Sequence, residues 1–253
     1  MPDWYAESFQ LALFTGQNWV QQRSLFEALT GVSPVDISER GQIQVRQESG
    51  PFSSAYLRVQ QQPSRTDIFL TDIPNRNTAN PTAPDYKQFF WVDKLDAAVP
   101  LFDSVIAKLP AFSQSVQRVA YLLTMIAPVP NPEAAVAALR EMLPLVQFDP
   151  ELDTDISWQI NRPRIVPEIG TINRLSKWNV LQAGVVAIPI GMPQLGISQL
   201  MTLPAQPTEF AARVELDANT SPLIQEISGE AVPSILARLR AFALEIAAKG
   251  DIP

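Results

Sequence analysis

A group of basic and amide side chains gathers between positions 161 and 177, and these residue types could hold an anion. Its members are Asn161, Arg162, Arg164, Asn173, Arg174 and Lys177. A guanidinium group grips a carboxylate or a phosphate with two parallel hydrogen bonds. The group therefore indicates an anion-binding site built from Arg162, Arg164, Arg174 and Lys177. The alternative is a sheet face on which the long stems of these side chains only cover apolar surface.

The residue types that are missing limit the chemistry further. The chain of 253 residues has no His and no Cys. Ser-His-Asp catalysis, cysteine nucleophiles, thiolate metal sites and disulfides are therefore excluded within one chain. A glycine-rich phosphate loop is also missing, and the chain has only ten glycines. An enzyme would need carboxylates, Lys, Tyr or a carboxylate-bound magnesium ion, so we rank this class last and expect no cofactor.

Acidic residues alternate between positions 149 and 155, in a pattern that resembles an oxygen-ligand loop for calcium or magnesium. The residues are Asp149, Glu151, Asp153 and Asp155. An EF-hand also needs a glycine at its sharp turn and a closing bidentate Glu, and neither stands at the required spacing. A solvated turn before a strand explains the same residues. We therefore predict no metal site.

The charge balance bears on the kind of partner. There are 26 acidic and 19 basic residues, which give a formal net charge of -7. A nucleic-acid backbone as the main partner requires clustered Lys and Arg, so we expect no nucleic-acid binding, although a local basic patch could still exist. With 46% hydrophobic and 18% charged residues, the composition is that of an ordinary globular protein.

The strongest anomaly is a stretch without any charged side chain, residues 178–208. Pro189 and Pro193 interrupt any helix there, so we predict no membrane span. The stretch is either packed within the monomer or forms an apolar flap, residues 183–207, that covers another subunit or a partner. A long uncharged surface loop would otherwise expose more apolar area than monomers usually do. The expected interface residues are Val185, Ile188, Ile190, Met192, Leu195, Ile197, Leu200 and Met201.

Strand-helix units are predicted at two places. Residues 116–125 are apolar and β-prone on both faces, as in an interior strand, and the prolines from Pro128 onward are expected to end it. Asn131 is the expected N-cap of the helix that follows. A similar unit opens the chain, with a strand at 9–15 and a helix at 19–29.

The remaining segments follow from alternation, helical spacing and turn residues. Strands are predicted at 42–47, 55–60, 67–70, 89–92, 155–161, 171–181 and 209–216, and helices at 93–109 and 232–248. Residues 74–88 have prolines and asparagines without apolar periodicity, which indicates an exposed loop.

These elements predict an α+β protein of two similar halves, 1–112 and 113–253. Each half would contain a strand, a helix, three or four antiparallel strands and a second helix, and a common sheet or interface would join the two. Gln42-Ile-Gln-Val-Arg and Trp158-Gln-Ile-Asn-Arg stand at comparable places, as do Tyr56-Leu-Arg and Ile172-Asn-Arg. In order of elements alone, each half resembles the repeat of TATA-binding proteins and helix-grip ligand-binding folds. Ordinary strand-helix alternation could mimic such a duplication.

Three functional hypotheses remain, from different classes. The leading one is a non-enzymatic interaction or assembly protein that uses residues 183–207 to contact a protein partner or a second copy. The second is a protein that binds a small anionic ligand in a pocket between sheet and helices. The third is a carboxylate- or magnesium-dependent enzyme. The first residues, Met1 to Glu7, contain no basic region followed by an apolar run, so we expect a cytoplasmic location.

Overall fold

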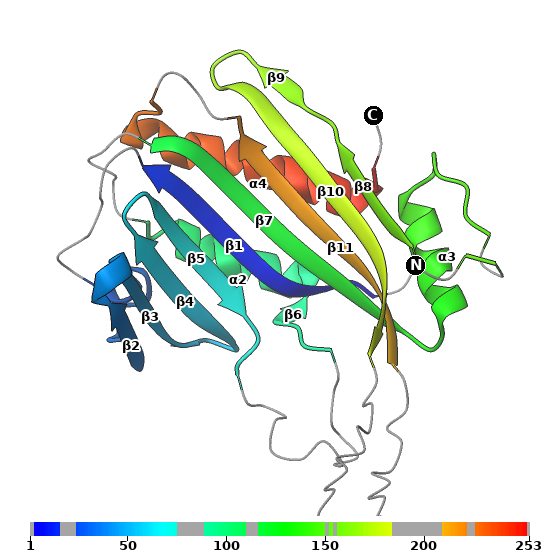
Figure 1. Cartoon of the computed structure of the whole chain (residues 1–253), viewed down its shortest axis with the longest axis horizontal. Coiled ribbons are helices and arrows are strands. Elements are labelled where there is room, and N and C mark those ends of the chain that lie inside the picture. The colour runs from blue at the N-terminus through cyan, green and yellow to red at the C-terminus, as the bar shows by residue number, and fades with distance from the viewer. Residues whose placement is uncertain are drawn as a thin grey trace, which may run out of the picture.

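The computed structural model describes residues 3–15, 24–74, 89–109, 116–149, 152–153, 156–183, 209–221 and 226–251. These residues form a single antiparallel sheet together with four α-helices (Figure 1). The predicted α+β class is therefore confirmed.

The elements follow one another along the chain with these bounds. Up to residue 106 they are β1 (Tyr5–Thr15), α1 (Leu25–Thr30), β2 (Asp36–Arg40), the 3₁₀ turn η1 (Gly41–Ile43), β3 (Val45–Phe52), β4 (Ala55–Gln62), β5 (Arg65–Thr71), β6 (Asp93–Lys94) and α2 (Leu95–Ile106). After it come β7 (Val116–Val129), α3 (Pro132–Met142), β8 (Ser157–Asn161), β9 (Arg164–Val166), β10 (Gly170–Ala183), β11 (Glu209–Thr220), η2 (Gly229–Ala231) and α4 (Val232–Lys249).

The sheet has β1 and β7 at its centre. Its strand order is β2-β3-β4-β5-β1-β7-β11-β10-β8, with β6 beside β1 and β9 beside β10. Leu11 of β1 lies opposite Tyr121 of β7, and Leu13 lies opposite Val119. The early and late parts of the chain therefore share one continuous sheet.

Every second residue of the central strands points toward the helices and forms the core. Phe9 of β1 stacks on Phe102 of α2, with ring centroids 4.9 Å apart, and Tyr121 lies beside both rings. Arg240 of α4 binds both carboxylate oxygens of Asp103 in α2, which ties the two long helices together. We call this side of the sheet the helix-covered face.

The opposite side of the sheet is the helix-free face. The register places Phe69, Gln10 and Leu122 side by side on it, one from each of β5, β1 and β7. Figure 1 looks onto this face, and no described helix lies in front of β5, β1, β7, β11 or β10. Phe89 and Trp91 pack on the part of this face around Ile126 and Ala211, so no described helix covers the face but part of it is buried.

Most predicted elements are present, and the helix signals are confirmed in detail. The Asn131 side chain accepts a hydrogen bond from the Ala134 N–H at 2.8 Å, and Pro132 occupies the first turn of α3. Gly31 ends α1 in the left-handed conformation, at φ 80°. Residues 16–23, where the first helix was predicted to begin, lie outside the described residues.

Several strand predictions were wrong. β7 continues through Pro128 to Val129, because its pairing with β1 ends at Ile126 and proline is tolerated on such a free edge. The strand predicted at 89–92 is absent, and the short β6 follows it at Asp93–Lys94 instead. The strand predicted at 42–47 begins only at Val45, after the turn η1.

Candidate functional site

The helix-free face places arginines directly beside phenylalanine rings. Phe14 of β1 lies between its cross-strand neighbours Arg65 of β5 and Arg118 of β7, whose guanidinium carbons are 4.8 and 5.4 Å from the ring centroid. Arg58 of β4 lies opposite Phe69 of β5, with the corresponding distance 4.3 Å. Such distances are typical of cation-π contacts. We call these five residues the Arg-Phe layer.

The charges of the Arg-Phe layer are only partly compensated. Arg65 forms an ion pair with Asp67 at 2.7 Å, and Gln10 donates a hydrogen bond to the same carboxylate at 2.8 Å. Arg58 and Arg118 have no carboxylate partner among the described residues, and the buried Nε–H of each has no acceptor there. Because each Nε–H is buried, hydrogen bonding to an anionic group falls to the terminal nitrogens of these two half-buried guanidinium groups.

Strict alternation in the strands explains this placement. Leu57 and Val59 of β4 point into the core, so Arg58 between them points to the helix-free face. On β1 and β7 the small residues Ala12 and Ala120 lie opposite each other, between the rows that hold Phe14 and Gln10. Their short side chains leave the arginines as the most prominent groups of this region.

The other half of the helix-free face is more evenly charged. Arg213 of β11 forms a 2.5 Å ion pair with Glu7 and also binds Glu215. Lys177 of β10 lies 3.7 Å from the same Glu215. Cations and carboxylates are matched here, in contrast to the Arg-Phe layer.

The predicted anion-binding residues divide between the two faces. The side chain of Arg174 is 1% exposed on the helix-covered face, where its Nη2 lies 3.3 Å from Glu245 of α4. Arg164 approaches the same carboxylate at 3.4 Å, and Arg162 binds Asp251 at 2.8 Å. Lys177 is on the helix-free face. The structure thus brings three of the four predicted residues together.

Arg174 is the most unusual member of that cluster. Burial and the neighbouring charge of Arg164 lower the pKa of the Arg174 guanidinium, while Glu245 acts in the opposite direction. Its Nε–H and Nη1 groups are buried without an acceptor among the described residues. The guanidinium also lies over the ring of Phe242, 5.3 Å from the centroid. Anion binding at this cluster stays a prediction.

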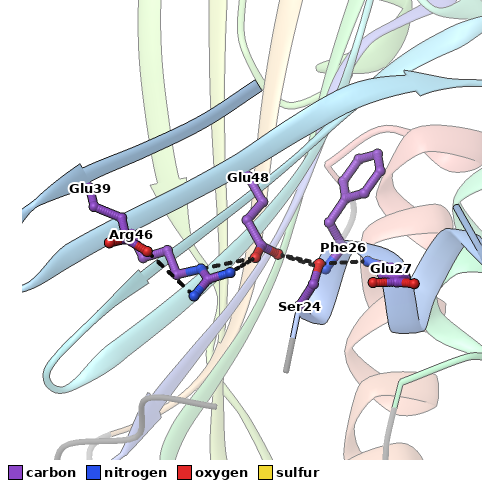
Figure 2. Close-up of polar contacts among 6 residues, drawn as sticks. All are labelled: Ser24, Phe26, Glu27, Glu39, Arg46 and Glu48. Atoms are coloured by element: carbon purple, nitrogen blue, oxygen red, sulfur yellow. Dashed lines mark hydrogen bonds and ion pairs between the residues drawn. The ribbon is translucent and has the colours of Figure 1, made fainter. Parts of the chain in front are cut away.

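A buried carboxylate, Glu48, has a structural role near the first helix (Figure 2). Its side chain is 1% exposed and accepts hydrogen bonds from Arg46 at 2.6 and 2.9 Å. Its second oxygen accepts from the Ser24 hydroxyl at 2.9 Å and from the Phe26 N–H at 3.0 Å. Both oxygens are therefore occupied, and Glu48 holds the start of α1 against β3 rather than acting as a base.

A hollow of about 540 Å³ opens between α2 and α4. Apolar side chains line most of it, among them Trp4, Val99 and Leu244. Its charged residues include Asp3 and Lys94, whose side chains pair with each other at 2.9 Å. No group of three or more acidic residues within the described ranges is arranged to hold a metal ion.

Two of the predicted sites fall wholly or partly outside the described residues. All eight predicted interface residues between Val185 and Met201 lie outside the described residues, and this prediction stays untested. In the acidic stretch, Glu151 and Asp155 are likewise outside, while the Asp149 N–H donates to Asp153 at 2.8 Å, as in a turn. None of the helices that the structure describes has both the length and the apolar character needed to cross a membrane.

No family model matches the chain, and no curated protein is significantly similar to it in sequence. The Arg-Phe layer was not predicted from the sequence, although a signal was present: Arg58 and Arg65 stand at the polar positions of strands whose alternate positions are mostly apolar. Only the register reveals that rings and guanidinium groups alternate across the strands.

Proposed function

We propose that this protein is a non-enzymatic interaction protein that binds an acidic, extended segment of a partner protein on its helix-free face. The observation that carries the proposal is the pair Arg58 and Arg118, half-buried guanidinium groups that lack a carboxylate partner among the described residues. Each is held against a phenylalanine ring, so little conformational freedom is lost when a carboxylate binds.

The spacing of the two arginines suggests the form of the ligand. Arg118 and Arg58 lie three strands apart across the sheet and four residues apart along it. Their Cα atoms are therefore about 20 Å apart, a distance that an extended chain covers in roughly six residues. Between them, Gln10 and Gln60 offer amide donors and acceptors that match a peptide backbone.

A protein segment suits this surface better than a nucleic acid does. The rings of Phe14 and Phe69 are already covered by guanidinium groups, so they are not available for stacking with bases. Glu215 and Asp217 lie farther along the same face and would repel a continuous polyphosphate, as would the net charge of -7.

Three finer expectations remain part of this proposal on sequence grounds. The uncharged segment 183–207 would supply a second contact, either with the partner or with another copy. A cytoplasmic location stays a prediction. The two halves, 1–112 and 113–253, would be a structural repeat that is similar to TATA-binding proteins or helix-grip folds in the order of its elements only. The proposal of a repeat is supported by the places of the first strands, β1 and β7, side by side at the centre of the sheet.

The small-anion hypothesis is retained as a second candidate because of Arg174. Its two buried N–H groups without acceptors are what a small phosphate or carboxylate would bind. If it is correct, inorganic phosphate should raise the melting temperature of the wild type more than chloride at equal ionic strength, and Arg174→Met should remove the difference. An equal effect of both salts on the wild type would refute it.

The main proposal is tested by fluorescence anisotropy with a labelled peptide of about twelve residues, carrying two Glu residues roughly six positions apart. We expect binding that weakens as salt is added, because carboxylate-guanidinium attraction is screened. The same peptide with Gln at both positions should bind much more weakly. Failure of the Glu peptide to bind, or tighter binding of an oligothymidylate of similar length, would overturn the proposal.

A further inference from the structure

We propose that two copies of this chain associate edge to edge through β2, antiparallel and around a twofold axis at Ser38. This surface is separate from the Arg-Phe layer, so the inference stands or falls independently of the proposed function. It rests on three features of the β2 region: an unpaired edge, a self-complementary charge pattern and a cluster of exposed apolar side chains.

β2 is the terminal strand of the sheet. It pairs with β3 on one side, and no other described element lies against its outer side. All five of its residues, Asp36–Arg40, are exposed. The outer edge therefore presents backbone N–H and C=O groups that can pair with another strand. β2 itself contains neither Pro nor Lys, residues that commonly protect such edges.

The sequence of β2 is complementary to itself. An antiparallel alignment centred on Ser38 places Asp36 opposite Arg40 of the second copy, and Arg40 opposite Asp36 of the second copy. Both pairs lie on the helix-free face, because residues two and four positions apart share a face. A shift by one residue in one direction would instead place Asp36 opposite Glu39. The twofold register is thus the one in which both opposite-charge pairs form.

Exposed apolar side chains flank the same edge. Val32 is 56% exposed, Val35 70%, Ile37 57% and Ile43 56%. Val32 and Val35 precede β2, Ile37 belongs to it and Ile43 follows it, so all four lie within residues 32–43. A second copy aligned on β2 would cover part of this apolar surface, which is a favourable contribution that a lone monomer lacks.

The charge pattern gives a test that does not depend on a single variant. The native mass of the full chain is measured by light scattering for the wild type, Asp36→Arg, Arg40→Asp and an equimolar mixture of the two variants. We expect the wild type at twice 28.0 kDa and each variant alone at 28.0 kDa, because each then places like charges opposite each other. The mixture should return to the dimer mass, because both arginines of the Asp36→Arg variant then lie opposite aspartates of the Arg40→Asp variant.

Asp36 also accepts a hydrogen bond from the Tyr56 hydroxyl at 2.9 Å, so Tyr56→Phe is the control for loss of that bond, and it should remain dimeric. Circular dichroism would verify that each variant is folded. Should a variant fail to fold, Glu39→Pro, which removes an N–H that the alternation of β2 directs to its outer edge, should give a monomer on its own. A native mass of 28.0 kDa for the wild type, or a dimer mass for both single variants, would overturn the proposal.

Discussion

The guanidinium carbon of Arg58 lies 4.3 Å from the ring centroid of Phe69, on the neighbouring strand of the helix-free face. The ring supports one side of the planar group and leaves its N–H donors directed elsewhere. Because no carboxylate among the described residues neutralises Arg58, the pair combines a fixed position with an unused charge. That combination is what a surface for acidic ligands requires, and it distinguishes this half of the face from the matched ion pairs around Arg213.

The contact between Arg58 and Phe69 should be measurable as a coupling energy. We expect a double-mutant cycle with Arg58→Ala and Phe69→Leu to give about 0.5–1 kcal/mol in urea unfolding, the usual range for a partly exposed cation-π pair. The matched control is the same cycle with Phe14→Leu, whose ring contacts Arg65 and Arg118 instead. Equal coupling in the two cycles would contradict the specific contact.

Glu48 should contribute far more to stability than its neighbour Glu39, although both carboxylates pair with Arg46. Glu48 is buried and fully hydrogen-bonded, whereas the side chain of Glu39 is 63% exposed and 3.4 Å from the guanidinium. We expect Glu48→Gln to lower the free energy of unfolding by about 2–4 kcal/mol, and Glu39→Gln by less than about 0.5 kcal/mol. Chemical denaturation measures both free energies of unfolding. Similar losses for the two variants would show that Glu48 does not hold the start of α1 against β3.

Two glycines with positive φ should respond differently to alanine. A Cβ at Gly250 would lie 2.1 Å from the backbone oxygen of Met142, while one at Gly31 meets nothing within 4 Å. Gly31→Ala should therefore cost about 1 kcal/mol from backbone conformation alone. Gly250→Ala should cost at least about 2 kcal/mol more, because the end of α4 must move away from α3. Thermal or urea unfolding would detect this, and equal losses would contradict the close approach.

Burial of Tyr121 should make the protein sensitive to alkali. Its side chain is fully buried, and burial raises the pKa of its hydroxyl. A raised pKa in the folded state means that stability is complete below the unfolded pKa of about 10 and falls as the pH rises beyond it, by about 1.4 kcal/mol per pH unit. Tyr121→Phe removes this contribution.

The variant should therefore match or exceed the wild type at neutral pH, since the hydroxyl has no hydrogen-bond partner among the described residues. Its advantage should grow above about pH 10. Urea unfolding of both proteins across this range is the measurement. A difference between them that does not change with pH would show that the hydroxyl is not buried.

The parts of the fold that could be predicted are those with a strong local signal. The capped start of α3 at Asn131 depends on neighbouring residues alone. The alternation of apolar and polar residues in β4 follows from the burial of only one face of that strand. β2 has five exposed residues and no apolar face, so nothing in Asp36–Arg40 marks a strand. It is a strand only because β3 pairs with it, which is a contact between segments.

The candidate site could not be predicted from the sequence, because it depends on which face each strand presents and on how the strands pair. Arg58 and Arg174 stand at comparable places in the two tripeptides that suggested a repeat, yet Arg58 lies on the helix-free face and Arg174 is buried beside α4. A one-residue difference in phase exchanges the faces of a strand, and short sequence similarity does not fix that phase. Likewise, Phe14 and Arg118 become neighbours only through the pairing of β1 with β7.

The most direct test of the proposed function is the affinity of the acidic peptide for two matched double variants. Arg58→Ala with Arg118→Ala removes the unpaired charges of the helix-free face. Arg140→Ala with Arg238→Ala removes the same charge from exposed positions on α3 and α4. We predict at least about a tenfold loss of affinity for the first pair, equivalent to about 1.4 kcal/mol, and little change for the second. Equal losses for both pairs would contradict binding at the helix-free face.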